Sequence, residues 1–281
     1  MTDTQPSMPV RFELPARTAS GVVLGLAAVA AVVGGGIYFS CFVALGAIAA
    51  LREWHRLVNG GQVAREMVPT GFGILAALWL ERVQSGWAWP VAAILLGACG
   101  AAFLSGARRL PAYWPIAWHA LGAIYVGLPA LALVLLRDAP RGGAIVGALF
   151  VAVWTADTGA LLFGRLIGGP KFAPILSPNK TWAGFLGGTI AAAIAEAIYI
   201  ALLGGNVSNA IVLGTFLALA GHCGDLFESW VKRQFRAKNT GRLIPGHGGV
   251  LDRIDSVLFA APVCASLIFL AGFHPLNGAG Q

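Results

Sequence analysis

Residues 224–256 read GDLFESWVKRQFRAKNTGRLIPGHGGVLDRIDS, and they concentrate acids, bases and glycines in a chain that is otherwise mostly apolar. The run opens with Asp225 at the end of an apolar segment and turns through 245–249. It then enters another apolar segment, which carries Asp252 and Asp255. Acids can hold a divalent cation, bases can bind phosphate, and a glycine turn lets backbone N–H groups approach a ligand. The stretch therefore has the parts of a phosphoryl- or nucleotidyl-transfer site.

The composition of the chain is that of a membrane protein. Hydrophobic residues make up 57% of it, charged residues only 11%, and the mean hydropathy is +0.76. In a soluble domain about 25% of the residues are charged. The net charge of +7 would also suit a nucleic-acid-binding protein, but membrane proteins collect Lys and Arg in their cytoplasmic loops. We attribute the charge to this bias and expect no nucleic-acid partner.

Nine apolar segments predict an all-α, polytopic integral membrane protein with about nine transmembrane helices. The predicted spans are about 18–35, 37–51, 68–81, 87–104, 114–136, 143–163, 181–203, 209–231 and 253–272. With the N-terminus in the cytoplasm, 16 of the 19 basic residues lie on the cytoplasmic side, as the positive-inside rule favours. We therefore expect a multi-pass protein of the cell (inner) membrane whose active site, with loops 164–180 and 231–253, faces the cytoplasm.

Three acids stand out within the predicted helices, where an ionised group at the centre costs about 2.5–3.5 kcal/mol. Asp157 and Asp225 each lie about six residues from the cytoplasmic end of their helix, or roughly 9 Å at 1.5 Å per residue. At this common depth they are expected to face one cavity. Glu196 lies nearer the opposite end of its helix, and we expect it to have a structural role.

The polar residues of the 224–256 stretch are spaced so that they share helix faces. Asp225, Ser229 and Lys232 follow an i, i+4, i+7 pattern. Asp252 and Asp255 are three residues apart at the start of the last helix, where the helix dipole favours carboxylates. This second pair is also typical of simple helix capping, and its spacing alone does not separate the two interpretations.

The same stretch resembles the signature of the phosphatidate cytidylyltransferase (CDP-diacylglycerol synthase) family. The similarity covers the 27 consecutive positions from Ser229 to Asp255. A second run, which starts at Asp157 and continues through SPNKTW at 177–182, is similar to another block of this family. The resemblance spans about 120–270. We therefore divide the chain into 1–110, transmembrane helices of generic sequence, and 111–281, a catalytic transmembrane region.

Two positions depart from the family pattern. Asn239 stands where the family usually has Asp, and Ala183 stands where it usually has Glu. We assign no catalytic role to either position. The loop that precedes Ala183 is basic and rich in Gly and Pro, which suits a phosphate-binding loop and also an ordinary solvated connector.

The resemblance implies an enzyme that converts CTP and phosphatidate to CDP-diacylglycerol and pyrophosphate at the lipid bilayer. It implies Mg²⁺, with a second cation left open, held by Asp225, Asp252 and Asp255. Lys232 joins these three in the catalytic set. The implied substrate-binding residues are Ser177, Lys180, Thr181, Ser229, Arg233, Lys238, His247, Gly248, Gly249 and Arg253. The oligomeric state stays open, with a homodimer among the alternatives.

Two other functions are compatible with parts of the sequence. A CTP-dependent kinase acting on a polyprenol-type lipid would use a comparable site. An ion-coupled membrane transporter would explain buried acids at matched depth, which also mark ion paths. The transporter leaves the six basic residues of the 224–256 stretch without a role.

Overall fold

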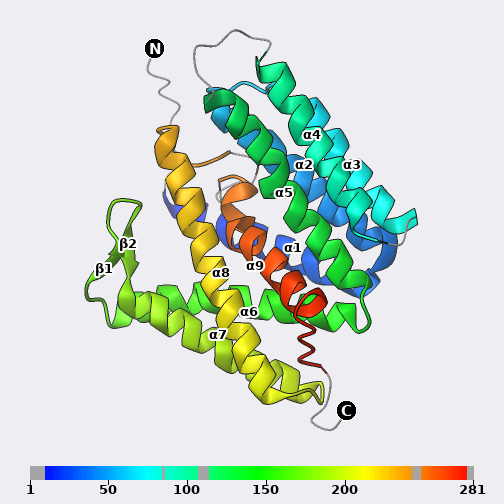
Figure 1. Ribbon diagram of the computed structural model, residues 1–281. Coiled ribbons are helices and arrows are strands. Elements are labelled where there is room, and N and C mark those ends of the chain that lie inside the picture. The colour runs from blue at the N-terminus through cyan, green and yellow to red at the C-terminus, as the bar shows by residue number, and fades with distance from the viewer. Residues whose placement is uncertain (1–9, 84–85, 107–113, 242, 244–247, 277–281) are drawn as a thin grey trace.

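The computed structural model describes residues 10–83, 86–106, 114–241, 243 and 248–276 (Figure 1). These residues form a largely helical molecule with one small hairpin. The helices are α1 (Val10–Gly34), α2 (Gly36–Val58), α3 (Met67–Val83), α4 (Ala88–Gly106), α5 (Trp114–Asp138), α6 (Gly142–Leu166), α7 (Trp182–Leu202), α8 (Val207–Gln234) and α9 (Leu251–Phe269), and the strands are β1 (Lys171–Ala173) and β2 (Ser177–Thr181).

Each of the predicted spans overlaps one of these helices. Six of the described helices are long and apolar enough to cross a membrane, namely α2, α4, α5, α6, α7 and α8. The apolar part of α1 is shorter and covers 21–34. The prediction of several membrane-spanning helices is therefore confirmed, whereas the count of nine spans and the cytoplasmic N-terminus stay predictions.

The segment between α6 and α7 shows that the all-α prediction was wrong in one place. Strands β1 and β2 pair there as an antiparallel hairpin, which Figure 1 shows extending beyond the start of α7. Gly168 and Gly169 have positive φ angles, so the chain leaves the helical conformation directly after α6. The Phe172 ring stacks on that of Phe185 with 4.6 Å between centroids, which fixes the hairpin against α7.

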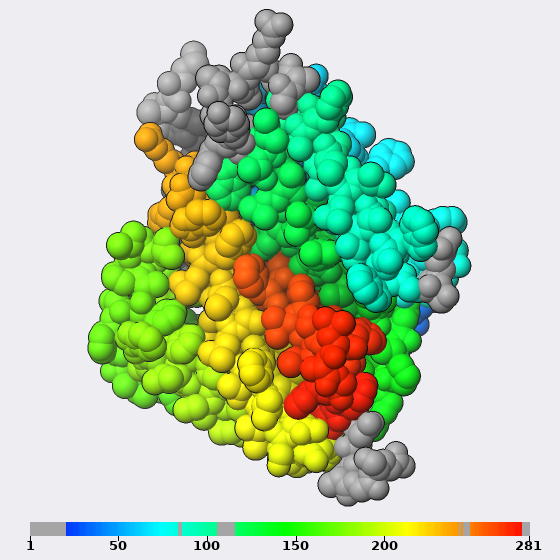
Figure 2. Space-filling model, in the orientation of Figure 1, coloured from blue at the N-terminus to red at the C-terminus, as the bar shows by residue number. Residues whose placement is uncertain are grey.

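Helix α5 connects the N-terminal helices α2, α3 and α4 with the C-terminal helices that carry the motifs. It packs against α2, α3 and α4 on one side and against α9 on the other. Helix α6 runs beside α7, α7 packs on α8, and α8 packs on α9. Figure 2 shows α9 (orange to red) lying between α8 (yellow to gold) and α5 (green). The motifs of the second half are thus brought together by contacts among α6, α7, α8 and α9.

The contact between α8 and α9 depends on a glycine. A Cβ atom at Gly224 would collide with the backbone carbonyl oxygen of Asp255. Only glycine allows the two helices to approach this closely without a shift of the backbone. The approach brings the next residue, Asp225, to the start of α9.

We predict that Gly224→Ala destabilises the protein. Alanine favours a helix by about 1 kcal/mol over glycine, but overpacking against a rigid backbone typically costs 1–3 kcal/mol, so the collision should outweigh the gain. The matched control is Gly46→Ala in α2, where an added Cβ would meet no atom within 4 Å. Thermal unfolding in detergent should show a lower midpoint for Gly224→Ala than for Gly46→Ala, and equal midpoints would contradict the close contact.

Candidate active site

The two motifs of the second half meet at one cavity of about 820 Å³. Its walls come from α6, the β1–β2 hairpin, the start of α7, the end of α8, Asn239 in the following loop and the start of α9. Five acidic side chains line it: Asp157, Asp225, Glu228, Asp252 and Asp255. Five basic side chains also line it: Arg165, Lys171, Lys180, Lys232 and Arg253. The expected common cavity of Asp157 and Asp225 is thus confirmed.

Asp225 is held by a lysine from the hairpin. The Lys180 Nζ atom lies 2.5 Å from Asp225 Oδ2, and both side chains are only partly exposed. This ion pair joins β2 to α8. It brings together two residues that are 45 positions apart in the chain. Because β2 is paired with β1, the hairpin fixes the direction from which the lysine approaches.

Two further carboxylates lie near Asp225. Asp157 of α6 accepts a 3.5 Å hydrogen bond from Ser256 Oγ on α9. Asp255 is close enough to Asp225 and Asp157 for the three charges to repel one another. Acids gathered in this way favour a bound cation, because a cation relieves their repulsion.

Asp252 is bound on both of its oxygen atoms. Oδ1 accepts from Lys232 Nζ at 2.9 Å. Oδ2 accepts from Thr240 N at 3.0 Å, Thr240 Oγ1 at 2.9 Å and Gly249 N at 2.9 Å. Asp252 therefore ties the loop that follows α8 to the start of α9, and it does more than cap its own helix.

Lys232 lies between two carboxylates. It contacts Glu228 Oε2 at 2.5 Å, one turn earlier on α8, as well as Asp252. Glu228 is only 2% exposed, so its charge depends on this lysine rather than on water.

The carboxylates do not form a complete metal site by themselves. Among the residues described here, no three His, Cys, Asp or Glu side chains are gathered closely enough to hold an ion. The oxygen donors are nevertheless of the kind that Mg²⁺ prefers, and Mg²⁺ commonly binds one or two carboxylates together with substrate phosphates. The donor set of the cavity thus fits a magnesium ion shared with a phosphorylated ligand.

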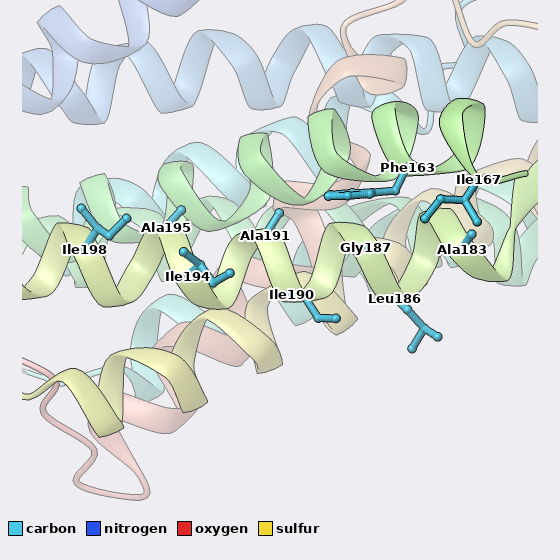
Figure 3. Close-up of a pocket in the computed structure, with 10 residues that line it drawn as sticks. All are labelled: Phe163, Ile167, Ala183, Leu186, Gly187, Ile190, Ala191, Ile194, Ala195 and Ile198. Carbon is cyan, nitrogen blue, oxygen red and sulfur yellow. The ribbon is translucent and has the colours of Figure 1, made fainter.

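An apolar groove of about 610 Å³ runs along α6 and α7 beside this cavity (Figure 3). It is lined by Phe163 of α6, by Ile167 directly after that helix, and by Ala183, Leu186, Gly187, Ile190, Ala191, Ile194, Ala195 and Ile198 of α7. Phe163 and Ala183 directly precede Gly164 and Gly184, which line the polar cavity. The groove and the cavity are therefore lined by neighbouring residues of the same two helices, which are in close contact at Gly164 and Gly184.

Comparison with known proteins identifies relatives of this chain. The cytidylyltransferase family matches residues 15–271. A phosphatidate cytidylyltransferase of Brucella suis is 39% identical over 273 residues, which cover 92% of this chain and 93% of the relative. One of Staphylococcus haemolyticus is 31% identical over 259 residues, or 90% of this chain and 98% of the relative.

The chain belongs to the cytidylyltransferase family. The match begins at residue 15, so it includes the N-terminal helices that look generic in sequence. The predicted membership is therefore confirmed, and it covers more of the chain than the motifs alone indicated.

The structure brings together most of the residues that the family resemblance singled out. Those that line the cavity are Lys180, Thr181, Asp225, Lys232, Asp252, Arg253 and Asp255. Gly248 and Gly249 lie against Asp252. The residues that do not line the cavity are Ser177, Ser229, Arg233 and Lys238. His247 lies outside the described residues.

One residue of the predicted binding set has a structural task. Thr181 is 5% exposed, and its Oγ1 accepts a 3.1 Å hydrogen bond from Gly184 N, so it caps the N-terminus of α7. The cap fixes the start of α7 directly after Lys180. Its assignment to substrate binding stays a prediction.

The two departures from the family pattern occupy different environments. Asn239 lines the polar cavity beside the acids and lysines. Ala183 lines the apolar groove instead. A carboxylate side chain at position 183 would therefore be attached to a residue that lines the apolar groove. One at position 239 would add a negative charge to the polar cavity.

Sequence analysis gave no role to three residues that the structure places at the site. Glu228 pairs with Lys232, and its i, i+4 spacing could have indicated this contact. Thr240 binds Asp252 through both its backbone and its hydroxyl. Glu53 reaches the same loop from α2, and no local pattern in the sequence indicates it.

We predict that Lys232→Met lowers stability by about 2 kcal/mol or more, because it leaves two largely buried carboxylates without their cation. The matched control is Arg233→Met, since the adjacent arginine is exposed and surface charges contribute about 0–1 kcal/mol. Thermal unfolding of both variants measures the difference. Equal midpoints would show that the lysine is not needed to neutralise Glu228 and Asp252.

Proposed function

We propose that this protein transfers the cytidylyl group of CTP to phosphatidate, giving CDP-diacylglycerol and pyrophosphate. The observation that carries the proposal is the single cavity in which Lys180 of the hairpin meets Asp225 and the acids of α9. The names of the relatives support the same reaction.

The chemistry requires two polyanions to meet. An oxygen of the phosphatidate phosphate attacks the α-phosphorus of CTP, a new P–O bond forms, and the bond to the leaving pyrophosphate breaks. Catalysis then rests on positioning and on neutralising charge. Lys180, Lys232 and Arg253 line the cavity and would bind the phosphates, with Arg233, Lys238 and Ser177 as further proposed contacts.

The balance of charge in the cavity supports a role for magnesium. With all groups ionised, five acids and five bases cancel, so nothing remains to neutralise a nucleotide. Asp225 and Asp252 are the proposed ligands, with Asp255 as a third ligand or as a group that orients them, and substrate phosphates would complete the set, because the carboxylates of the described residues do not make a metal site by themselves. Bound there, Mg²⁺ would screen the phosphates and stabilise the charge of the leaving pyrophosphate. Phosphates that bind Lys180 and Lys232 would release Asp225 and Asp252 from their present ion pairs.

The lipid substrate would come from the bilayer. Helices α6 and α7 are long and apolar enough to cross a membrane, so the groove along them would lie among lipid chains, and neighbouring residues of the same helices line the polar cavity. A phosphatidate can then keep its acyl chains in an apolar environment while its phosphate enters the cavity. In the predicted orientation this cavity faces the cytoplasm, on the side of the cell membrane that holds 16 of the 19 basic residues.

Radiolabelled CTP and purified protein test the proposal directly. Label from the α-phosphate should enter lipid only when phosphatidate is added, with one pyrophosphate released per lipid formed. Release of CDP together with a phosphorylated lipid alcohol would instead identify a lipid kinase. No nucleotide turnover under any of these conditions would overturn the proposal.

We expect Asp225→Asn and Asp252→Asn to abolish turnover while the protein stays folded, because each removes a proposed magnesium partner. Glu196→Gln is the matched control: Glu196 is a fully buried carboxylate of α7 that does not line the cavity, and this variant should keep most of its activity. The assay is CTP incorporation at saturating Mg²⁺. Near-normal rates for either Asp variant would refute its assignment as a ligand.

We further expect Asn239→Asp and Ala183→Glu, which restore the family's usual carboxylates, to change the rate less than about tenfold, or about 1.4 kcal/mol. The acids that line the cavity are present without them, and Ala183 faces the apolar groove. The same assay compares both variants with the unmodified protein. An inactive parent that gains activity in either variant would contradict this expectation.

A further inference from the structure

Glu53 of α2 lies far from the motifs in sequence but reaches the loop between α8 and α9. It is 2% exposed. Its Oε2 atom accepts a 2.9 Å hydrogen bond from Leu251 N and lies 3.4 Å from Thr240 Oγ1, whose single proton is closer to Asp252 Oδ2. One carboxylate oxygen therefore contacts both Thr240, in the loop, and Leu251, the first residue of α9.

The loop is shaped to fit this carboxylate. A Cβ atom at Gly241 would collide with Glu53 Oε1, and one at Gly249 would collide with Oε2. The backbone on both sides thus packs directly on the Glu53 side chain, with no room for a larger residue. Such close fitting at two separate glycines indicates that the backbone at Gly241 and Gly249 is arranged around Glu53.

Asp252 is held by the same part of the loop. Thr240 N, Thr240 Oγ1 and Gly249 N all donate to Asp252 Oδ2. The residues that fix Asp252 are therefore themselves fixed by Glu53. Glu53 does not line the polar cavity, so it acts on Asp252 only through the loop.

The part of α2 that carries Glu53 is packed firmly against α5. On the next residue, Trp54 Nε1 donates a 2.8 Å hydrogen bond to the Trp118 carbonyl oxygen on α5, and the Trp54 side chain is fully buried. This contact fixes α2 against α5 beside the carboxylate. The loop is thus tied to the packed helices of the N-terminal half.

A buried carboxylate is a costly way to hold a loop. Within the described residues Glu53 Oε1 is buried and has no hydrogen-bond partner. Leaving a buried polar atom unpaired costs about 1–3 kcal/mol, so packing alone would be better served by an apolar side chain. What an apolar residue could not supply is an acceptor for Leu251 N at the start of α9.

We infer that Glu53 is a positioning residue for the cytidylyl transfer: through Gly241, Gly249 and Leu251 it holds the loop that follows α8 against the start of α9, so that Asp252 and Lys232 keep their place in the cavity. The inference rests on the proposed function for its kinetic consequences. Its geometric part, that Glu53 orders the loop, can be measured without any activity.

Three variants test the inference. Glu53→Gln keeps an oxygen that can accept from Leu251 N, whereas Glu53→Ala removes it. Glu196→Gln is the control, since it alters a carboxylate that is equally buried but does not contact the loop. For each, kcat and the KM values for CTP and phosphatidate are measured per folded protein, together with the rate of trypsin cleavage after Arg236 and Lys238.

We expect Glu53→Ala to lower kcat at least 30-fold, to leave KM for phosphatidate within threefold, and to speed trypsin cleavage in the loop at least fivefold. Glu53→Gln should stay within threefold of the unmodified protein in kcat and in cleavage. Glu196→Gln should change neither. A merely structural role would instead lower the yield of folded protein without changing kcat per folded molecule.

Several outcomes would overturn the inference. One is a Glu53→Ala variant whose kcat per folded protein and cleavage rate are unchanged, and another is a Glu53→Gln variant as impaired as Glu53→Ala. If Glu53→Ala does not fold, Thr240→Val replaces it, because it removes the hydroxyl that contacts both Glu53 and Asp252. That variant should also lose kcat and gain cleavage in the loop, and normal values would again refute the inference. An unmodified protein that makes no CDP-lipid would overturn the proposed function, while the cleavage rates would still decide whether Glu53 orders the loop.

Discussion

Two lysine–carboxylate pairs hold the polar cavity in its present shape. Lys180 with Asp225 joins the hairpin to α8, and Lys232 with Asp252 joins α8 to α9. Each pair is partly shielded from water, where opposite charges attract more strongly and unpaired charges cost more. The same side chains are the proposed partners of the phosphates and of magnesium, so the contacts that maintain the site are also the contacts that a substrate would exchange.

This exchange requires that the backbone stays in place while side chains change partners. The close contact at Gly224 sets the distance between α8 and α9. The Thr181 cap fixes the start of α7 behind Lys180. Glu53 and the glycines that pack on it hold the loop before α9. The supports of the site therefore come from α8, β2, α2 and the loop before α9.

Much of the site could be predicted because its chemistry repeats in local patterns. Equal depth placed Asp157 and Asp225 in one cavity, and the helical spacing of Asp225 and Lys232 put both on its wall. The hairpin could not be predicted in this way, since glycine and proline indicate where a helix stops but not that two short strands will pair. The role of Glu53 is harder still to predict from sequence. Its neighbours Arg52 and Arg56 are typical of a solvated helix end, and the residue that it binds most closely is 198 positions away. Contacts of that kind are set by tertiary packing alone.

The shape of the α6–α7 groove bears on which lipids the enzyme would distinguish. The side chains on its outer side are about half exposed, with Leu186 at 54%, Ile190 at 59% and Ile194 at 55%. An acyl chain lying there would touch protein on one side and neighbouring lipid on the other. Because one side of such a surface is open, the protein would not enclose the acyl chain and would not select for its length or unsaturation. Selectivity would then fall on the headgroup, which the charged cavity would bind, and lipids of varied acyl composition could enter one biosynthetic step on equal terms.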